Sequence, residues 1–254
     1  MKKYISIIAV IILVLAWEIG VDFTHANKFV VVAPSVILKQ ISLDWQMLAG
    51  ALWFTLKVTW AALALAIVTS IPMAFLINRS KLFEAGVLPI AVALQVTPII
   101  AIAPIVLVWT GPDFPERALL ICAWLATFFP IFASQLTGLR SIAPDLRDLF
   151  KLYNASAWQR IIKLELPASL PSLMAGLKIA SGSALIGAVV AEFAIGGVGN
   201  SEGLAWALAQ ATKQLEIARA FACLILLTGI GIFQYACLSW LEARILKKRG
   251  ILPI

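Results

Sequence analysis

The amino-acid sequence predicts an all-α integral membrane protein with six transmembrane helices and a helical cytoplasmic element between spans four and five. Hydrophobic residues make up 62% of the chain and charged residues 13%, whereas an average soluble domain is about half apolar and about a quarter charged. Six apolar stretches are long enough, at about 20 residues each, to cross a hydrocarbon core of roughly 30 Å. The charged segment between the fourth and the fifth stretch carries its own helix-start signals.

The six spans are expected near residues 4–22, 51–77, 86–109, 118–136, 172–195 and 218–240. The first span, with an outer loop, occupies residues 1–28, and the main membrane domain occupies residues 29–254. An alternative stays open for the first span. Lys2 and Lys3 precede an apolar run, and Thr24-His25-Ala26 is a plausible cleavage site for a signal peptide. The run nevertheless continues to Val21, at the full length of a span.

Positive charges are distributed unevenly between the segments that join the spans. With the N-terminus inside, fourteen of the 20 lysines and arginines lie in or next to cytoplasmic segments. The other six lie in outer segments and flanks: Lys28, Lys39, Lys57, Arg117, Lys213 and Arg219. Cytoplasmic loops of membrane proteins carry an excess of Lys and Arg. We therefore expect both termini, and the charged segment between spans four and five, to lie in the cytoplasm.

The segment between the first two spans is too polar to cross a membrane. Pro34-Ser35 provides a helix start, and an amphipathic pattern follows it at Val36, Ile37, Ile41 and Leu43. We expect a helix on the outer surface here.

Span three carries three prolines, Pro89, Pro98 and Pro104. Each proline leaves one backbone carbonyl without its helical partner, and lipid cannot replace that partner. The helix faces around these carbonyls should therefore pack on protein or line a cavity. A transport path and an ordinary kinked helix within a bundle both fit this pattern.

Composition and motifs exclude several classes of chemistry. The net charge of +7 is spread over short segments between apolar runs, so no solvated basic face is available for nucleic acid. Cys122, Cys223 and Cys237 lie within apolar runs and have neither metal-ligand nor disulfide spacing. The single histidine, His25, has no partner for a triad or a metal site, and we interpret it as a loop residue. The chain has no G-x-x-x-x-G-K-[ST] motif, and therefore no phosphate-binding loop of its own.

Ionisable residues are scarce within the predicted spans. Glu18 and Glu192 lie near outer ends, and Lys57 lies near the start of span two. A secondary carrier usually keeps ionisable groups near the midplane of the membrane, so this alternative is disfavoured. An integral membrane enzyme is a further alternative, but it needs a polar catalytic cluster, and the chain offers one histidine and scattered acids. The energy for any transport is therefore expected from another subunit.

The polar segment between spans four and five predicts two short amphipathic helices. Asp145 follows Pro144 and is a candidate N-cap for the first helix. An apolar stripe then follows at helical spacing, comprising Leu146, Leu149, Phe150 and Tyr153. One interpretation is a loop that lies on lipid headgroups, with Trp158 as its anchor.

A sharp corner separates these two helices. Asn154 is suited to the left-handed conformation that ends a helix, and Ser156-Ala157-Trp158-Gln159 fits the S-x-x-Q capping box. We expect Pro167 and Pro171 to break the second helix and to restart the chain as span five. A corner capped from both sides favours a rigid element that is offered to a partner protein.

This segment resembles the signature of the membrane subunits of binding-protein-dependent ABC importers. The family shows E-A-A, three residues, Gly, nine residues, Ile, one residue and Leu-Pro, and the corresponding positions here are Asp148-Leu149-Phe150, Asn154, Leu164 and Leu166-Pro167. Further likenesses point to the nitrate/sulfonate/taurine branch, which also includes permeases for thiamine-pyrimidine and riboflavin-like compounds: Asn154-Ala155-Ser156, Leu170-Pro171 and Ala191-Glu192. The likeness runs from about residue 30 to the C-terminus.

The resemblance implies that residues 140–171 form a coupling loop with a cytoplasmic coupling helix that docks on an ABC ATPase dimer. The residues implied in this contact are Asp148, Phe150, Tyr153, Asn154, Ala155, Ser156, Trp158, Leu166 and Pro167. It further implies a homodimer in the bacterial inner membrane and an extracytoplasmic solute-binding protein. No cofactor is implied in this chain, because ATP and Mg²⁺ belong to the ATPase. The resemblance also implies that the solute is a nitrate/sulfonate/taurine-like compound or a pyrimidine or vitamin precursor.

Span five carries small residues every four positions, at Gly176, Ala180, Ala184 and Ala188. Such stripes let membrane helices approach closely. Glu192 continues the same row, so we expect it to face protein near the outer end. With Ser183 and Gly187 it is a candidate for an outer gate. The alternative is a carboxylate hydrogen-bonded to backbone in the glycine-rich loop that follows.

Overall fold

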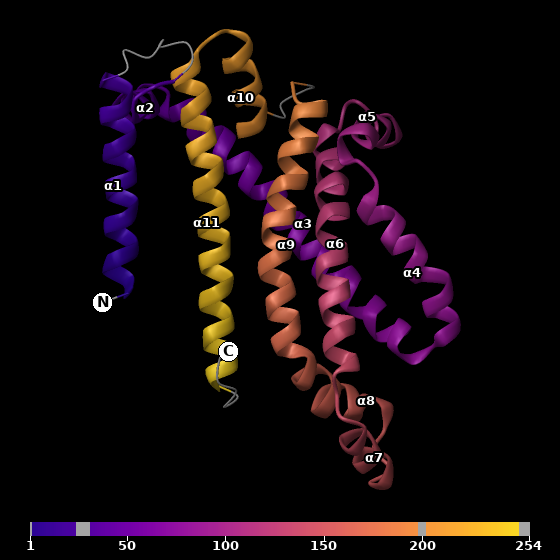
Figure 1. Ribbon diagram of the computed structural model, residues 1–254. Coiled ribbons are helices and arrows are strands. Elements are labelled where there is room, and N and C mark those ends of the chain that lie inside the picture. The colour runs from indigo at the N-terminus through magenta and orange to yellow at the C-terminus, as the bar shows by residue number, and fades with distance from the viewer. Residues whose placement is uncertain (1, 24–30, 198–201, 249–254) are drawn as a thin grey trace.

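The computed structural model of the chain describes residues 2–23, 31–197 and 202–248, and every regular element in these ranges is a helix (Figure 1). The helices are α1 (Lys2–Phe23), α2 (Pro34–Leu43), α3 (Trp45–Arg79), α4 (Lys81–Val96), α5 (Ile99–Thr110), α6 (Pro115–Arg140), α7 (Pro144–Leu152), α8 (Ala157–Arg160), the π-helix η1 (Ile161–Glu165), α9 (Leu166–Ile195), α10 (Leu204–Lys213) and α11 (Ile217–Lys248). His25, the possible cleavage site at 24–26 and the middle of the glycine-rich loop lie outside the described residues.

Four helical stretches are long and apolar enough to cross a membrane. These are Trp45–Arg79, Pro115–Arg140, Ala157–Ile195 and Ile217–Lys247. They contain the spans predicted at 51–77, 118–136, 172–195 and 218–240. In α1, the apolar stretch Ile11–Val21 is shorter than these four. The structure therefore confirms an all-helical membrane protein, with four candidate spans or five if α4 and α5 together make one.

The span predicted near residues 86–109 consists of two helices, α4 and α5, instead of one. Helices α4 and α5 are bent by 105° at the break between Val96 and Ile99. Thr97 and Pro98 both have extended backbone at this break. Proline disfavours helical backbone in the residue before it and donates no hydrogen bond of its own, so Pro98 ends one helix and begins the next. Pro89 and Pro104, in contrast, lie inside helices.

Helices α6 and α9 pack closely because small residues line their contact. A Cβ atom on Gly176 would lie 2.4 Å from Ser134 Cβ, and one on Gly187 would lie 2.8 Å from Ala126 Cβ. Ala180 and Ala188 in the same rows are fully buried. The predicted role of this stripe in close helix packing is thereby confirmed.

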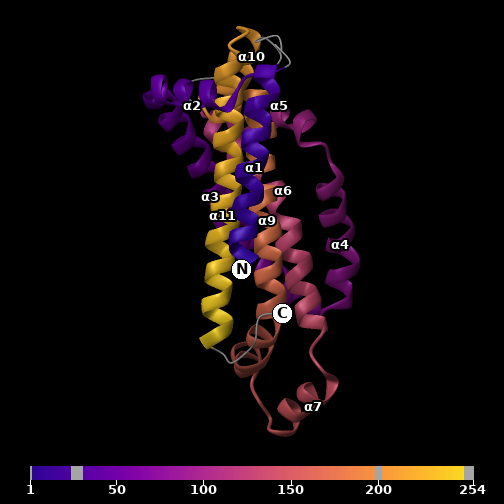
Figure 2. The same ribbon diagram turned by 60° about the vertical axis from the view of Figure 1, so that its left-hand side comes forward.

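The short helices gather at the two ends of the long ones (Figures 1 and 2). Helices α2, α5 and α10 lie at one end, which we call the α10 end. Helices α7 and α8 lie at the other, the α7 end, and the start of α1 and the end of α11 point toward it. The helix predicted to start at Pro34-Ser35 is confirmed as α2, which begins at Pro34 and buries Ile37 completely.

Candidate functional site

The corner at the α7 end begins where α7 stops. Asn154 has a φ of 48°, which is the left-handed conformation predicted for it. The Ala155 N–H donates to the Phe150 carbonyl at 3.0 Å, and the Asn154 N–H donates to the Lys151 carbonyl at 2.9 Å. These two bonds make a Schellman motif, which satisfies the last carbonyls of a helix. The backbone at Asn154 therefore turns as a glycine would.

The second half of the corner is the predicted capping box. Ser156 Oγ accepts from the Gln159 N–H at 3.2 Å, and Gln159 Oε1 accepts from the Ser156 N–H at 2.8 Å. Helix α8 therefore begins at Ala157, as expected. The prediction for Asp145 is wrong, because the N-cap of α7 is Ala143 and no side chain caps it. Pro144 occupies the first helical position, which places Asp145 inside the first turn, past the capping position.

Apolar side chains remain exposed around this corner. The corner surface, as we name it, comprises Leu146, Leu149, Leu152, Tyr153 and Trp158. Tyr153 is 79% exposed and Trp158 68% exposed. Phe150 is half-buried, while Asp148 forms an exposed ion pair with Lys151 at 2.8 Å. A contiguous apolar surface that is rimmed by charges is typical of a contact site for another protein or a membrane.

The chain does not break after the corner, contrary to the prediction for Pro167 and Pro171. The helical path is continuous from Ala157 to Ile195. It passes through the π-helix η1, whose closing bond runs from the Leu166 N–H to the Ile161 carbonyl. Pro167 follows at the start of α9, where a missing N–H costs little, and Pro171 is accommodated inside α9. Leu166 and Pro167 therefore lie at a rigid junction between corner and span.

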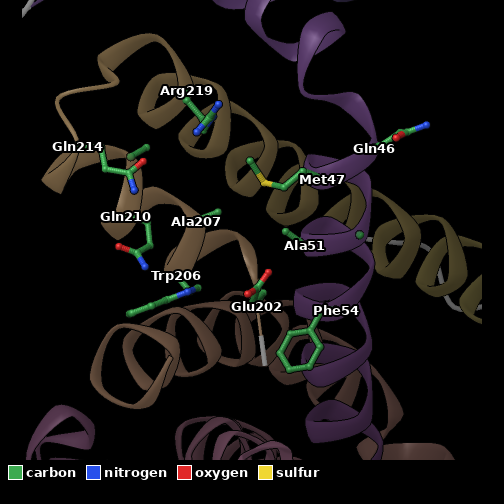
Figure 3. Close-up of a pocket in the computed structure, with 12 residues that line it drawn as sticks. Gln46, Met47, Ala51, Phe54, Glu202, Trp206, Ala207, Gln210, Gln214 and Arg219 are labelled. Atoms are coloured by element: carbon green, nitrogen blue, oxygen red, sulfur yellow. The ribbon is translucent and has the colours of Figure 1, made fainter. Parts of the chain in front are cut away.

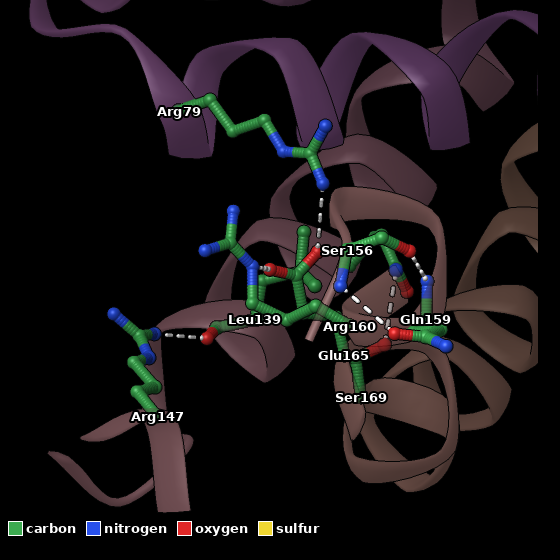
Figure 4. A network of polar contacts seen from close by, with 9 residues as sticks. Arg79, Leu139, Arg147, Ser156, Gln159, Arg160, Glu165 and Ser169 are labelled. Atoms are coloured by element: carbon green, nitrogen blue, oxygen red, sulfur yellow. Dashed lines mark hydrogen bonds and ion pairs between the residues drawn. The ribbon is translucent and has the colours of Figure 1, made fainter. Parts of the chain in front are cut away.

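Glu165 connects the corner to α3 (Figure 4). Its carboxylate is only 10% exposed and pairs with Arg160 at 3.1 Å and with Arg79 at 3.5 Å. Arg147 donates to the Leu139 carbonyl at 2.7 Å, which fixes α7 against the end of α6. Sequence reasoning missed Glu165, although it is the one acid between Asp148 and Glu192. Its partner Arg79 is 86 residues away in the sequence, so the pairing could not be inferred from spacing.

At the α10 end, Glu192 lies fully buried between three helices. Its carboxylate accepts from Thr55 Oγ1 of α3 at 2.8 Å and from the Ala205 N–H of α10 at 2.9 Å. Thr55 Oγ1 in turn accepts from the Leu204 N–H at 2.9 Å. Two side chains from other helices thus cap α10, whose own N-cap residue is Gly203.

The close approach of Glu192 explains why glycine precedes α10. A Cβ atom on Gly203 would lie 2.2 Å from the Glu192 carboxyl carbon. Glu192 faces protein, as predicted, and it bonds to the backbone just after the glycine-rich loop. Gly187 packs against α6, and Ser183 Oγ is half-buried on α9, 3.4 Å from the Ile179 carbonyl. The structure does not bring these two residues into contact with the Glu192 carboxylate.

Other polar contacts also join helices. Glu18 of α1 accepts from the Ser35 N–H at 3.0 Å and from Ser35 Oγ at 2.6 Å, and so caps α2. Gln234 of α11 donates to Thr59 Oγ1 at 2.9 Å. Lys178 of α9 pairs with Glu242 of α11 at 2.6 Å. Acids near the ends of the long helices thus serve mainly to hold neighbouring helices.

Comparison with known proteins identifies the family of this chain. Residues 66–247 match the family described as the binding-protein-dependent transport system inner membrane component. The chain belongs to this family. It is 30% identical to a probable ABC transporter permease protein of Haemophilus influenzae, over 92% of this chain and 93% of that one. It is 31% identical to the formylaminopyrimidine transport permease protein ThiX of Halalkalibacterium halodurans, over 91% and 90% of the two chains.

A solved structure shares the fold. The inward-facing MetNI methionine ABC transporter superposes with a TM-score of 0.61 over 83% of this chain and 98% of that chain, at 20% sequence identity. Family membership makes this chain a multi-pass inner membrane permease subunit of an ABC importer for small solutes. Such a subunit is non-catalytic, holds no cofactor and works with an ATPase and a solute-binding protein.

Proposed function

We propose that this chain forms a homodimeric permease and that residues 140–171 couple it to a cytoplasmic ABC ATPase dimer. One observation carries the proposal: the corner is capped from both sides, by the Schellman motif at Asn154 and by the capping box at Ser156. A corner that is fixed by its own hydrogen bonds can transmit motion of the ATPase to the long helices with little deformation of its own. The exposed corner surface supplies apolar area for the partner to cover.

The residues of the loop divide between three tasks in this proposal. Tyr153, Trp158 and the half-buried Phe150 contact the ATPase, and Asp148 provides a charged contact at the edge. Asn154, Ala155 and Ser156 hold the shape of the corner. Leu166 and Pro167 pass its motion to α9 through the π-helix. Glu165 passes part of the same motion to α3 through Arg79.

The α7 end is cytoplasmic in this proposal, and the chain has six spans. Support comes from the charge bias of the sequence and from the start of α1 and the end of α11, which both point toward the α7 end (Figure 1). Helix α1 and the bent pair α4–α5 are the two additional spans. The α10 end then faces the solute-binding protein.

Glu192 supports the outer gate in this proposal and does not line the path. The carboxylate is fully buried and has hydrogen-bond partners on both oxygens, so a passing solute would have to displace Thr55 or α10. Ser183 and Gly187 are assigned to the packing of α9. Glu192 would transmit gate motion by keeping α10 attached to α9 and α3.

The solute is proposed to be a pyrimidine or vitamin precursor. The support is the 31% identical relative that transports formylaminopyrimidine and is matched over nearly its whole length. The sulfonate class is the alternative, because the sequence signature is shared with the nitrate/sulfonate/taurine branch. Competition by unlabelled solutes of each class for binding-protein-dependent uptake separates the two classes.

Co-purification tests the coupling proposal. Replacing Ala155 and Ser156 with Glu should release the ATPase from the tagged permease while leaving the permease inserted in the membrane. Lys163→Glu is the matched control, since Lys163 is exposed on the π-helix outside the corner and should retain the ATPase. Solute uptake that persists without bound ATPase would contradict the importer mechanism and would favour a secondary carrier.

A further inference from the structure

A cavity of about 510 Å³ opens at the α10 end between the start of α3, helix α10 and the start of α11 (Figure 3). This volume falls within the range of about 300 to 1,000 Å³ that is usual for small-molecule sites. Trp206 and Phe54 provide aromatic surface, and Met47 lies across from Trp206. Gln210, Gln214 and Glu202 bring polar groups to the same space. An apolar wall with a few polar groups is the usual composition of a ligand pocket.

The charge of this cavity disfavours an anionic occupant. Arg219 lines it, but its guanidinium already pairs with Asp44 at 2.6 Å and with Glu216. Lys213 lies over the Trp206 ring, 5.6 Å from its centroid, and is not one of the lining residues. In the described part of the chain, no cation lies within ion-pair distance of Glu202. An anion would therefore meet a free carboxylate and no free guanidinium.

The polar groups of the cavity suit a planar compound with donors and acceptors along its edge. A glutamine amide presents one carbonyl acceptor and two N–H donors in one plane. Within the described residues, the side chains of Gln210 and Gln214 form no hydrogen bond with other protein groups, so both can bond to a ligand. Glu202 can accept from an amino group of such a compound.

From these features we infer that the cavity binds the transported solute at the outer mouth, and that this solute is an uncharged or weakly basic nitrogen heterocycle. The inference rests on the proposed function, because it assigns the solute class of the same transporter. A ligand here would touch α3 through Met47 and Phe54 and α10 through Trp206 and Gln210. These are the helices that Thr55 and Glu192 hold together, so ligand binding would act on the capped end of α10.

Saturation-transfer NMR on the permease–ATPase complex in lipid nanodiscs tests this inference, with 4-aminopyrimidine as the heterocyclic probe and ethanesulfonate as the anionic probe. The expected result is binding of 4-aminopyrimidine and no competition by ethanesulfonate. The double variant Gln210→Ala/Gln214→Ala should weaken binding about five- to tenfold, as expected for the loss of one or two hydrogen bonds. Gln95→Ala is the matched control, since Gln95 is an exposed glutamine of α4 outside the cavity.

Trp206→Phe tests the aromatic wall of the cavity and keeps an aromatic ring against Gly196 and Gly197, on which Trp206 packs. It should weaken binding less than the glutamine pair does. The inference is overturned if 4-aminopyrimidine does not bind, if the double variant binds it as well as the unchanged protein does, or if ethanesulfonate displaces it. ATPase retention is measured in the same samples. A complex that assembles but does not bind the probe contradicts the cavity assignment alone, whereas loss of the ATPase from the unchanged permease contradicts the proposed function.

Discussion

The two ends of the molecule attach short helices to long ones by opposite means. At the α7 end, the bonds that form the corner join residues at most five positions apart, as between Ala155 and Phe150. At the α10 end, the bonds that hold α10 join Thr55 to Glu192, 137 positions apart, and Leu204 to Thr55, 149 positions apart. The corner can therefore keep its shape when the long helices move, whereas α10 keeps its place only while α3 and α9 stay together.

This difference suggests a division of labour within a transport cycle. A rigid corner is useful where force enters from the ATPase, because little motion is lost in deforming it. A helix capped by two separate spans is useful at the α10 end, because its position depends on the distance between those spans. Variants that remove the long-range caps should therefore affect stability and the outer end together, and variants of the corner should affect assembly with the ATPase.

Removing the Glu192 carboxylate should have the largest effect. Glu192→Ala leaves the Thr55 hydroxyl and the Ala205 N–H without their acceptor in a fully buried site. Buried unsatisfied groups cost about 1 to 3 kcal/mol each, so we expect the permease to lose about 2 to 6 kcal/mol of unfolding free energy. Denaturant unfolding of the purified permease measures this loss, and solute uptake should fall with it.

Glu192→Gln should retain part of the cap, since the amide oxygen can accept from Ala205 and the amide nitrogen can donate to Thr55. The control Glu116→Ala changes an exposed acid in the first turn of α6 and should be close to neutral. If both Glu192 variants were as stable and as active as the unchanged protein, the supporting role of Glu192 would be refuted.

The same contrast explains which parts of the structure could be predicted from the sequence. Asn154 and the Ser156–Gln159 box were found because each depends on neighbouring residues and on known conformational preferences. Glu192 was placed correctly against protein from its helical row, but its partner Thr55 was missed. A threonine in an apolar helix gives no sign of which distant backbone group it will bond. Glu165 was missed for the same reason.

Errors at the prolines have a related physical cause. Pro98 lies at a bend of 105°, whereas Pro167 and Pro171 lie in a continuous helix, and each of the three has at least one apolar neighbour. The difference lies in the surrounding backbone. The π-helix before Pro167 changes the hydrogen-bond register, while extended backbone at Thr97 and Pro98 cannot continue a helix. Neither condition can be read from the proline itself.

The corner should be sensitive to backbone conformation at one position. Asn154→Val places a β-branched residue at a φ of 48°, which costs about 1 to 3 kcal/mol locally. We expect reduced ATPase retention on the tagged permease with normal insertion in the membrane. Asn154→Gly is the matched control and should retain the ATPase fully, because glycine adopts this conformation without strain. Equal retention by both variants would show that the left-handed turn is not needed for docking.

A smaller effect is expected from the link between the corner and α3. Glu165→Gln removes the negative charge that pairs with both Arg79 and Arg160. Both arginine side chains are 35% exposed, so water can partly replace the lost contacts. The expected loss of stability is about 1 kcal/mol, near the upper limit for exposed ion pairs. The informative measurement is the ratio of solute taken up to ATP hydrolysed, which should fall if Glu165 transmits motion.

Glu84→Gln provides the comparison for Glu165. Glu84 pairs with one guanidinium, that of Arg140, and the distance between the paired atoms is 2.7 Å. This ion pair lies outside the corner. It should leave the uptake ratio unchanged. An equal fall of the ratio in both variants would assign the effect to general loosening at the α7 end.

The smallest expected effect tests a long-range contact at the α10 end. Asp44 lies between α2 and α3, and its carboxylate accepts from Arg219 of α11 at 2.6 Å. This hydrogen bond lowers the pKa of Asp44 below its ordinary value, against the opposing effect of burial, and Gln40 assists. Because the folded pKa is the lower one, the ionised carboxylate stabilises the fold above the ordinary pKa of about 4. This contribution disappears as the pH falls through the folded pKa.

Melting temperatures of the purified permease between pH 7 and pH 3 should therefore fall more steeply for the unchanged protein than for Asp44→Asn. The difference at pH 7 should correspond to about 1 kcal/mol or less, as expected for a partly exposed pair. Arg219→Gln should remove the same pH-dependent part, and the double variant should add nothing further, because both changes remove one contact. An Asp44→Asn profile parallel to that of the unchanged protein would mean that α11 is held at this end by packing alone, and that long-range polar contacts act only at the cap of α10.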